Sequence, residues 1–368
     1  MGTKKIKIRL FVCALLVIII AGAFAGCRSR ARREVRFSYG TVLRNEFVYN
    51  VGKVVPVTIE QSTEFDGVFS DDGLYLLYSS DRERGNFDIY LRALGDITTV
   101  RITAHPAKDV SPAISPDGKR LAFVSLREDP EGDIFVVNIN PAELLETAAE
   151  SPTDIPSLDS KAKNITQYQD PVSKDIKIIR DASPAWSPDS DWIAFSSNRD
   201  GTDNIWMIDR KGRNLKQITT KGGLYPRFSP DGKKIIFISY RDEKGRGDVY
   251  IKDLISGSEK RITDTPNIEL YPSFMKDDKE IVYTLIDRDT NGDGTINLKD
   301  TSILMYKNLS TGKEYPLTLR SQSSFAPRYS EALRKINERF FNVIIYSDQI
   351  GENININIIP EEGVIPKK

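Results

Sequence analysis

Apolar and polar positions alternate along most of the chain after residue 53, and polar turns interrupt this alternation at regular intervals. One pattern recurs six times, and most copies contain the turn Ser-Pro-Asp-Gly or a close variant. The six segments are 66–73, 111–118, 183–190, 225–232, 271–278 and 326–330. Alternation with period two predicts half-buried β-strands. Repetition at a fixed period predicts an array of one structural unit.

Each turn is followed by an apolar second strand, a third strand and a short fourth element. The second strands are expected at 75–79, 121–125, 193–197, 235–239, 281–285 and 343–347. Third strands resemble Asp88-Ile-Tyr-Leu, and the fourth element often ends in Ile-Thr, as at Ile102-Thr103. In the turn, Pro sets φ, Asp hydrogen-bonds its own backbone and Gly accepts a positive φ. Four short strands at a base spacing of about 42–46 residues predict one β-propeller blade per unit.

The two ends of the repeat region predict how the ring closes. The sixth unit ends with the alternating strand 353–358, and no fourth strand follows it. The stretch 53–59 precedes the first unit and has the form of a fourth strand. Joining the two would cover two open sheet edges. We therefore expect an all-β, six-bladed β-propeller of four-stranded blades over residues 53–360, closed by an N-terminal strand in the last blade, with a tail at 361–368. A β-sandwich does not explain the shared turn sequence.

The repeated Ser-Pro-Asp-Gly turn, the Ser/Arg/Asp turn after the second strand and the Ile-Tyr third strand resemble the TolB-like β-propeller repeat family. The resemblance covers residues from about 53 to 360. It implies a scaffold in the cell envelope that docks segments of protein or peptide partners in its central channel. The sequence differs from TolB itself because a short segment, rather than the TolB N-terminal α/β domain, precedes the repeats.

The N-terminus has the pattern of an export signal. Four basic side chains lie within residues 4–9, and an uncharged apolar run extends from Leu10 to Gly26. Residues Phe24-Ala-Gly-Cys27 resemble the lipobox of bacterial lipoproteins, although Phe24 occupies a position where Leu is preferred. We expect a lipoprotein signal peptide at 1–26, lipidation of Cys27 and a tether at 27–52. Cleavage after Ala25 and an uncleaved anchor are the alternatives.

Lipidation would attach the protein to a membrane surface without a membrane-spanning segment. The residue after the cysteine is Arg28 rather than the aspartate associated with inner-membrane retention. This favours a lipid-anchored protein of the outer membrane that faces the periplasm, with the cell surface as the alternative.

Composition excludes several classes of function. The net charge is zero, so nothing favours nucleic acid as a partner. Both cysteines, Cys13 and Cys27, precede the repeats, and His105 is the single histidine. No Gly-x-Ser-x-Gly nucleophile elbow is present. We therefore expect a binding scaffold and not an enzyme. A glycan-binding propeller is the alternative, and a propeller hydrolase or lyase is less favoured, since the lyases that use similar propellers need several histidine ligands.

The segment Asp289-Thr-Asn-Gly-Asp-Gly-Thr-Ile-Asn-Leu-Lys-Asp300 has the spacing of a calcium-binding EF-hand loop, with Gly294 at its sharp turn and Ile296 packing inward. The expected Ca²⁺ ligands are Asp289, Asn291, Asp293, Thr295 (through its carbonyl), Asn297 and Asp300. The loop would be an insertion between the second and third strands of the fifth blade. We expect the Ca²⁺ to be structural. The alternative is a metal-free Asn/Asp/Gly hairpin loop.

Charged residues also recur at equivalent places in successive units. An arginine follows the second strand at Arg82, Arg127, Arg199, Arg241 and Arg288, and an acidic residue precedes the first strand at Glu64, Asp109, Asp181 and Glu269. These residues could bind a partner as a charged ring and an acidic rim of the channel. A repeated salt-bridged turn is the favoured reading of the arginines. An insertion at 139–180 is expected to contain a short helix at 141–150, and its role stays open.

Overall fold

The computed structural model describes residues 40–44, 47–51, 55–58, 62–83, 85–93, 98–150, 157–168, 178–243, 246–318, 323–330, 343–350 and 353–360. The predicted signal peptide, Cys27 and the tail at 361–368 lie outside the described residues. None of the helices within the described part of the chain is long and apolar enough to cross a membrane.

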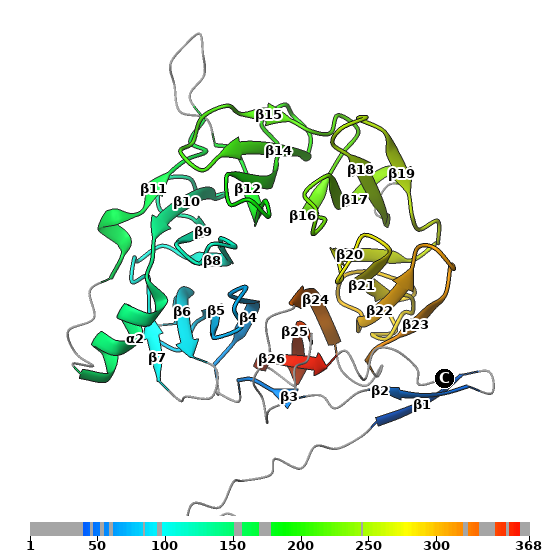
Figure 1. The fold of residues 1–368 in the computed structure, drawn as a ribbon. Coiled ribbons are helices and arrows are strands. Elements are labelled where there is room, and N and C mark those ends of the chain that lie inside the picture. The colour runs from blue at the N-terminus through cyan, green and yellow to red at the C-terminus, as the bar shows by residue number, and fades with distance from the viewer. Residues whose placement is uncertain are drawn as a thin grey trace, which may run out of the picture. The chain divides into compact units, whose positions relative to one another are not determined.

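Six four-stranded antiparallel sheets are arranged in a ring (Figure 1), and two cavities lined by their inner strands form its central channel. Blade 1 contains β4 (Glu64–Phe69), β5 (Tyr75–Ser80), β6 (Asp88–Ala93) and β7 (Thr99–Arg101), and blade 2 contains β8 (Asp109–Ile114), β9 (Arg120–Ser125), β10 (Asp133–Asn138) and β11 (Lys163–Asn164). Blade 3 contains β12 (Asp181–Trp186), β13 (Trp192–Ser197), β14 (Asn204–Asp209) and β15 (Lys216–Gln217), and blade 4 contains β16 (Leu224–Phe228), β17 (Lys234–Glu243), β18 (Arg246–Asp253) and β19 (Glu259–Arg261). Blade 5 contains β20 (Ile268–Phe274), β21 (Glu280–Ile286), β22 (Ile303–Asn308) and β23 (Glu314–Pro316). Blade 6 contains β24 (Ser323–Ser330), β25 (Val343–Ile350), β26 (Asn353–Pro360) and, from the other end of the repeats, β3 (Val55–Pro56).

Blade 6 closes the ring. Val55 and Pro56 of β3 pair antiparallel with β26, and the backbone N–H of Val57 donates to the carbonyl of Ile356 at 2.8 Å. The adjoining core joins Tyr78 of blade 1 to Ile345 of blade 6. The predicted six-bladed propeller with an N-terminal strand in its last blade is therefore confirmed.

An apolar residue followed by threonine links the outer two strands of every blade, as Ile-Thr in blades 1–4, Leu317-Thr318 in blade 5 and Val57-Thr58 in blade 6. The fourth strand ends just before this pair, and the threonine Oγ1 accepts a hydrogen bond from a backbone N–H of the third strand. The six donor–acceptor pairs are Ile89–Thr103, Ile134–Thr166, Ile205–Thr219, Val249–Thr263, Leu304–Thr318 and Ile356–Thr58, at 2.8–3.0 Å. All six threonines are buried. Each hydroxyl satisfies a buried amide that the short outer strand does not reach.

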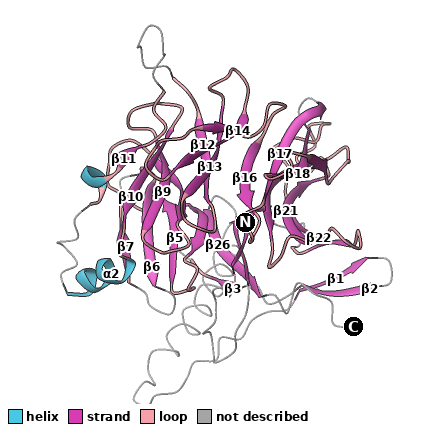
Figure 2. Ribbon diagram, turned by 45° about the horizontal axis from the view of Figure 1, so that its top comes forward, coloured by secondary structure: helices cyan, strands magenta, loops and turns pink. Residues whose placement is uncertain are grey.

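A helix, a hairpin and the short 3₁₀-helix Asp159–Lys161 lie outside the blades. The helix α2 (Pro141–Glu150), predicted from the sequence, packs its Ala148 against the core shared by blades 1 and 2, beside β6 and β7 (Figure 2). A hairpin of β1 (Gly40–Arg44) and β2 (Phe47–Val51) occupies part of the segment expected to be a tether. The sequence analysis did not predict that hairpin.

Candidate functional site

The inner strand of every blade contains a β-bulge that faces the channel. In all six bulges, a residue other than glycine adopts a left-handed conformation, which is uncommon and costs energy. These residues are Asp66, Ser111, Ser183, Tyr225, Tyr271 and Ala326, with φ between 49° and 57°. The left-handed residue is followed by a proline in blades 2–6 and by Gly67 in blade 1. Proline within a strand is a sign of a bulge, so this feature was readable from the sequence but was not predicted.

Hydrogen bonds between blades hold several of these bulges in place. The backbone N–H of Ser111 donates to the hydroxyl of Ser79 in blade 1 at 3.2 Å. The equivalent contacts join Tyr225 to Ser196 at 3.1 Å and Ala326 to Thr284 at 3.2 Å. Neighbouring blades thus hold these three left-handed residues in place.

The channel contains two cavities that meet at a pair of arginines. The smaller cavity, about 140 Å³, is lined by all six left-handed residues, and the larger, about 420 Å³, opens among the Ser-Pro-Asp-Gly turns. Arg227 and Arg328 line both. Most of the other lining of the larger cavity is proline and aromatic or aliphatic side chains, including Phe69, Pro184, Trp186, Phe228 and Phe274.

Arg227 and Arg328 make only backbone hydrogen bonds with the described residues. The Nη1 of Arg227 donates to the carbonyl of Pro226 at 2.7 Å, and that of Arg328 donates to the carbonyl of Pro112 at 3.1 Å. Burial, followed by the charge of Arg328, lowers the pKa of Arg227 well below its usual value. Burial likewise lowers the pKa of Arg328, and the charge of Asp66 opposes this shift. Sequence reasoning missed both arginines, because only the folded ring brings them together.

The arginines that follow the second strands have a different environment. Arg82 pairs with Glu64, Arg127 with Asp109 at 2.8 Å and Arg199 with Asp181 at 2.8 Å, and all three carboxylates are fully buried. The guanidinium groups also lie over aromatic rings, such as that of Phe135, 4.8 Å from Arg127. These ion pairs form the repeated salt-bridged turn that was the favoured interpretation of the arginines.

Arg241 and Glu269 depart from that pairing. Arg241 pairs with Glu259 on β19. Glu269 is buried and receives a hydrogen bond from the Thr265 hydroxyl at 2.6 Å, and its Oε2 has no hydrogen-bond partner among the described residues. Burial raises the pKa of Glu269 to about 8. Arg288, which follows the equivalent strand of blade 5, is exposed to solvent.

The predicted acidic rim therefore needs correction. Glu64, Asp109, Asp181 and Glu269 are buried inside their blades, and none lines either channel cavity. The sequence places them just before a strand but does not show that their side chains turn into the blade. Partner binding by these residues and by the blade arginines stays a prediction.

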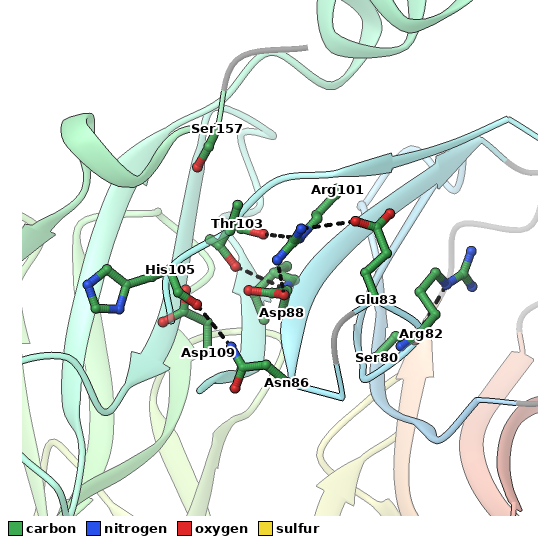
Figure 3. Close-up of polar contacts among 12 residues, drawn as sticks. Ser80, Arg82, Glu83, Asn86, Asp88, Arg101, Thr103, His105, Asp109 and Ser157 are labelled. Atoms are coloured by element: carbon green, nitrogen blue, oxygen red, sulfur yellow. Dashed lines mark hydrogen bonds and ion pairs between the residues drawn. The ribbon is translucent and has the colours of Figure 1, made fainter. Parts of the chain in front are cut away.

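A second charged cluster joins the third and fourth strands (Figure 3). In blade 1, Arg101 donates to Asp88 at 2.6 Å and to Glu83 at 2.9 Å. Asn164 to Asp133, at 2.7 Å, and Arg261 to Asp248, at 2.7 Å, repeat the contact in blades 2 and 4. Burial raises the pKa of Asp88 to about 6. The recurrence indicates a structural role.

The single histidine lies beside this cluster. The Nδ1 of His105 accepts the backbone N–H of Ala107 at 3.0 Å, and its carbonyl accepts the Asn86 amide at 2.9 Å. Within the described residues, no group of three or more His, Cys, Asp or Glu side chains is placed to hold a metal ion. His105 therefore orders a turn between blades 1 and 2.

The predicted calcium loop lies between β21 and β22 of blade 5, as expected. Its backbone wraps around its own side chains: Asp289 accepts the N–H of Gly294 at 2.7 Å, and Asp300 accepts that of Thr290 at 2.7 Å. Ile296 packs on the core formed by Ile268, Leu270 and Ile286, as predicted. The atoms expected to bind the metal ion are all oxygens, which suits a hard cation. The carboxylates of Asp289 and Asp300, however, accept hydrogen bonds from backbone amides. No group of three carboxylates placed to hold a metal ion occurs among the described residues.

Comparison with known proteins agrees with this architecture. A family model described as the TolB beta propeller domain matches residues 163–333. TolB of the Tol-Pal system from Francisella tularensis is 27% identical over 200 residues, which are 53% of this chain and 39% of that protein. The chain spans half or less of the length of the curated relatives it matches. The structure of TolB from Acinetobacter baumannii superposes with a TM-score of 0.53 at 20% identity, covering 79% of this chain and 64% of that one.

The chain is a six-bladed β-propeller that is similar to TolB. An oligogalacturonate lyase from Vibrio parahaemolyticus also superposes on this TolB-like propeller, with a TM-score of 0.52 at 12% identity, covering 89% of this chain and 97% of that one. Structural likeness at such identities shows the fold alone. Propellers of this fold therefore include an enzyme as well as TolB, so the site must decide the function.

Proposed function

We propose that this TolB-like propeller is a non-enzymatic scaffold that binds a protein or peptide partner of the bacterial cell envelope in its central channel. The observation that carries the proposal is the larger channel cavity, about 420 Å³, with an apolar lining and the two arginines at its inner end. A concave apolar surface with a few placed polar groups is typical of a binding site. The similarity to a protein of the Tol-Pal system supports an envelope partner.

The lining of the cavity favours a peptide over a glycan. Trp186 is 7% exposed and donates its Nε1–H to the carbonyl of Ala113 at 2.9 Å, and Phe69 and Phe274 are each 4% exposed. These rings are packed into the blades and do not form a flat exposed platform for a sugar. An apolar peptide side chain would instead fill the space between them.

Site-specific photocrosslinking tests the proposed function. A photoreactive amino acid replaces Pro230, an exposed residue that lines the larger cavity. In the matched control it replaces Lys211, which is exposed in the turn after β14. We expect a discrete crosslinked protein in cell envelopes only for the Pro230 position. Identical products from both positions, or none from Pro230, would contradict a channel partner.

Membrane attachment forms a second part of the proposal. The lipobox-like segment at 24–27 supports lipidation of Cys27 and an anchor on the outer membrane. Fractionation of cells that express wild-type protein or Cys27→Ala tests this. The wild type should remain with membranes and the variant should be released, whereas equal retention of both would exclude a lipid anchor at Cys27.

A structural Ca²⁺ in the blade 5 loop is the third part of the proposal. Asp289, Asn291, Asp293, Asn297 and Asp300 would supply side-chain oxygens, and Thr295 its carbonyl. Bound Ca²⁺ would neutralise the loop carboxylates and order a loop whose first seven residues are exposed. The ion would stabilise blade 5 and would take no part in a reaction.

A further inference from the structure

Arg227 and Arg328 occupy the same position in two different blades. Each is the second residue after the left-handed residue of the inner strand. At this position the six blades carry Val68, Ala113, Ala185, Arg227, Ser273 and Arg328. Blades 4, 5 and 6 therefore present an arginine, a serine and an arginine in succession, while blades 1, 2 and 3 present small apolar side chains. One half of the channel wall is polar, with the Ser273 hydroxyl donating to the carbonyl of Phe274 at 3.1 Å, and the other half is apolar.

The positive charge on this wall is not matched by the protein. Within the described part of the chain, neither Arg227 nor Arg328 forms an ion pair, whereas Arg82, Arg127, Arg199 and Arg241 all do. Asp66 is the carboxylate that lines the smaller cavity, and its Oδ2 already accepts the Ser111 hydroxyl at 2.7 Å. Enclosed arginines are normally paired with an acid. Among the described residues these two lack such a partner, and an acid supplied by a ligand would pair with them.

The shape and lining of the channel restrict that ligand. A guanidinium group matches a carboxylate through paired N–H donors. Next to the two arginines, the larger cavity is lined by prolines and by aromatic and aliphatic side chains, which suit apolar side chains rather than free inorganic anions or sugars. Beyond the arginines lies the smaller cavity, of about 140 Å³. A polypeptide that ends at the arginines stays within the larger cavity, whereas one that continues must enter the smaller cavity.

We propose that Arg227 and Arg328 bind the C-terminal carboxylate of a partner polypeptide whose last apolar side chains occupy the larger channel cavity. This assignment rests on the proposed function, since it requires a peptide in the channel. It adds the chemistry that the channel selects, namely a free chain end.

The probes are three pools of N-acetylated pentapeptides with apolar residues at their last two positions. The first pool ends in a free carboxylate and the second in a carboxamide. A third pool has the carboxamide end and one internal glutamate, which separates a side-chain carboxylate from a chain end. Each pool is passed over the immobilised full chain in detergent, and retained peptides are quantified by mass spectrometry. The free-acid pool should be retained at least about tenfold more than either amide pool, since a buried arginine–carboxylate pair is lost in both.

Arg227→Gln and Arg328→Gln should each abolish the preference for the free acid, while Arg210→Gln, which changes a solvent-exposed ion pair with Asp191, should leave it unchanged. Thermal unfolding confirms that the variants fold. Neither channel variant should unfold at a lower temperature than the wild type, because each removes an uncompensated charge. Retention without a free-acid preference, or a preference that survives in both channel variants, overturns the carboxylate site but not the peptide scaffold. Retention of no pool, together with no photocrosslinked partner at Pro230, overturns both.

Discussion

The backbone N–H of Ile356 donates to the hydroxyl of Thr58 at 2.9 Å, and 298 residues of sequence separate the two. The same contact, made between residues of one blade unit, recurs in the other five blades. In blade 6 it also joins the two ends of the ring. The contact therefore has two roles, to satisfy a buried amide and to close the propeller.

Thr58→Val should lower the free energy of unfolding by about 1–3 kcal/mol, because the buried N–H of Ile356 loses its acceptor while the side-chain shape is retained. Thr219→Val removes the equivalent contact within blade 3 and should lower the free energy of unfolding by about the same amount. Chemical denaturation measures both. Thr220→Val is the matched control, since Thr220 is exposed and adjacent to Thr219, and its stability should stay near that of the wild type. Equal stability of Thr58→Val and Thr220→Val would contradict the role of the hydroxyl.

Asp181→Ala should destabilise the protein by about 3–5 kcal/mol, because it leaves Arg199 buried without its acid. Asp191→Ala removes a surface pair whose side chains are 36% and 56% exposed, and it should cost less than about 1 kcal/mol. Denaturant titration of the two variants gives the comparison. The double variant Asp181→Ala/Arg199→Met should recover part of the loss. A double variant as unstable as Asp181→Ala alone would mean that the arginine charge is not the cause.

The raised pKa of Glu269 predicts that the stability of the protein depends on pH. Its pKa is about 8 in the folded protein against 4.5 for an ordinary glutamate, so between these values the native state binds more protons than the unfolded state. The contribution of Glu269 to stability is therefore fully present below about pH 4.5 and is lost as the pH rises towards 8. It should fall by up to about 1.4 kcal/mol per pH unit. Glu269→Gln removes this dependence.

Unfolding of wild type and Glu269→Gln between pH 5 and 8 measures the effect. Burial also raises the pKa of Asp88, Asp133 and Asp348 to about 6, and these groups titrate in both proteins. The difference between the two stability curves therefore isolates Glu269. The advantage of the variant should grow with pH, and parallel curves would refute the assignment.

Calcium binding can be tested by calorimetric titration of CaCl₂ into the full chain. We expect one site in the wild type and at least about tenfold weaker binding in Asp289→Ala or Asp293→Ala, since each removes a charged ligand. Asp264→Ala is the control, because Asp264 is 82% exposed in a different loop. No calcium-dependent heat in the wild type, or equal binding by wild type and ligand variants, would remove the calcium proposal.

Much of the fold was predictable because its signals are local. Alternation, the Ser-Pro-Asp-Gly turns and the unmatched strands at the two ends were sufficient to predict six blades and their closure. The burial of Glu64 and Asp109 was not predicted, since the sequence does not show whether a residue at the start of a strand points into the channel or into the blade. The pair Arg227 and Arg328 was also missed, because their proximity arises from ring geometry and not from sequence spacing.

The seam between β3 and β26 has a mechanical consequence. Among the described residues, β3 pairs with β26 through Val55 and Pro56, so a pulling force on the segment before Val55 would act on this short ladder first. Peeling β3 away would separate Thr58 from Ile356 and break the circle at one point, while the hydrogen-bonded ladders within blades 1–5 would stay whole. The propeller would then behave as an arc with a free end, and tension on its N-terminal side would alter the width of the channel.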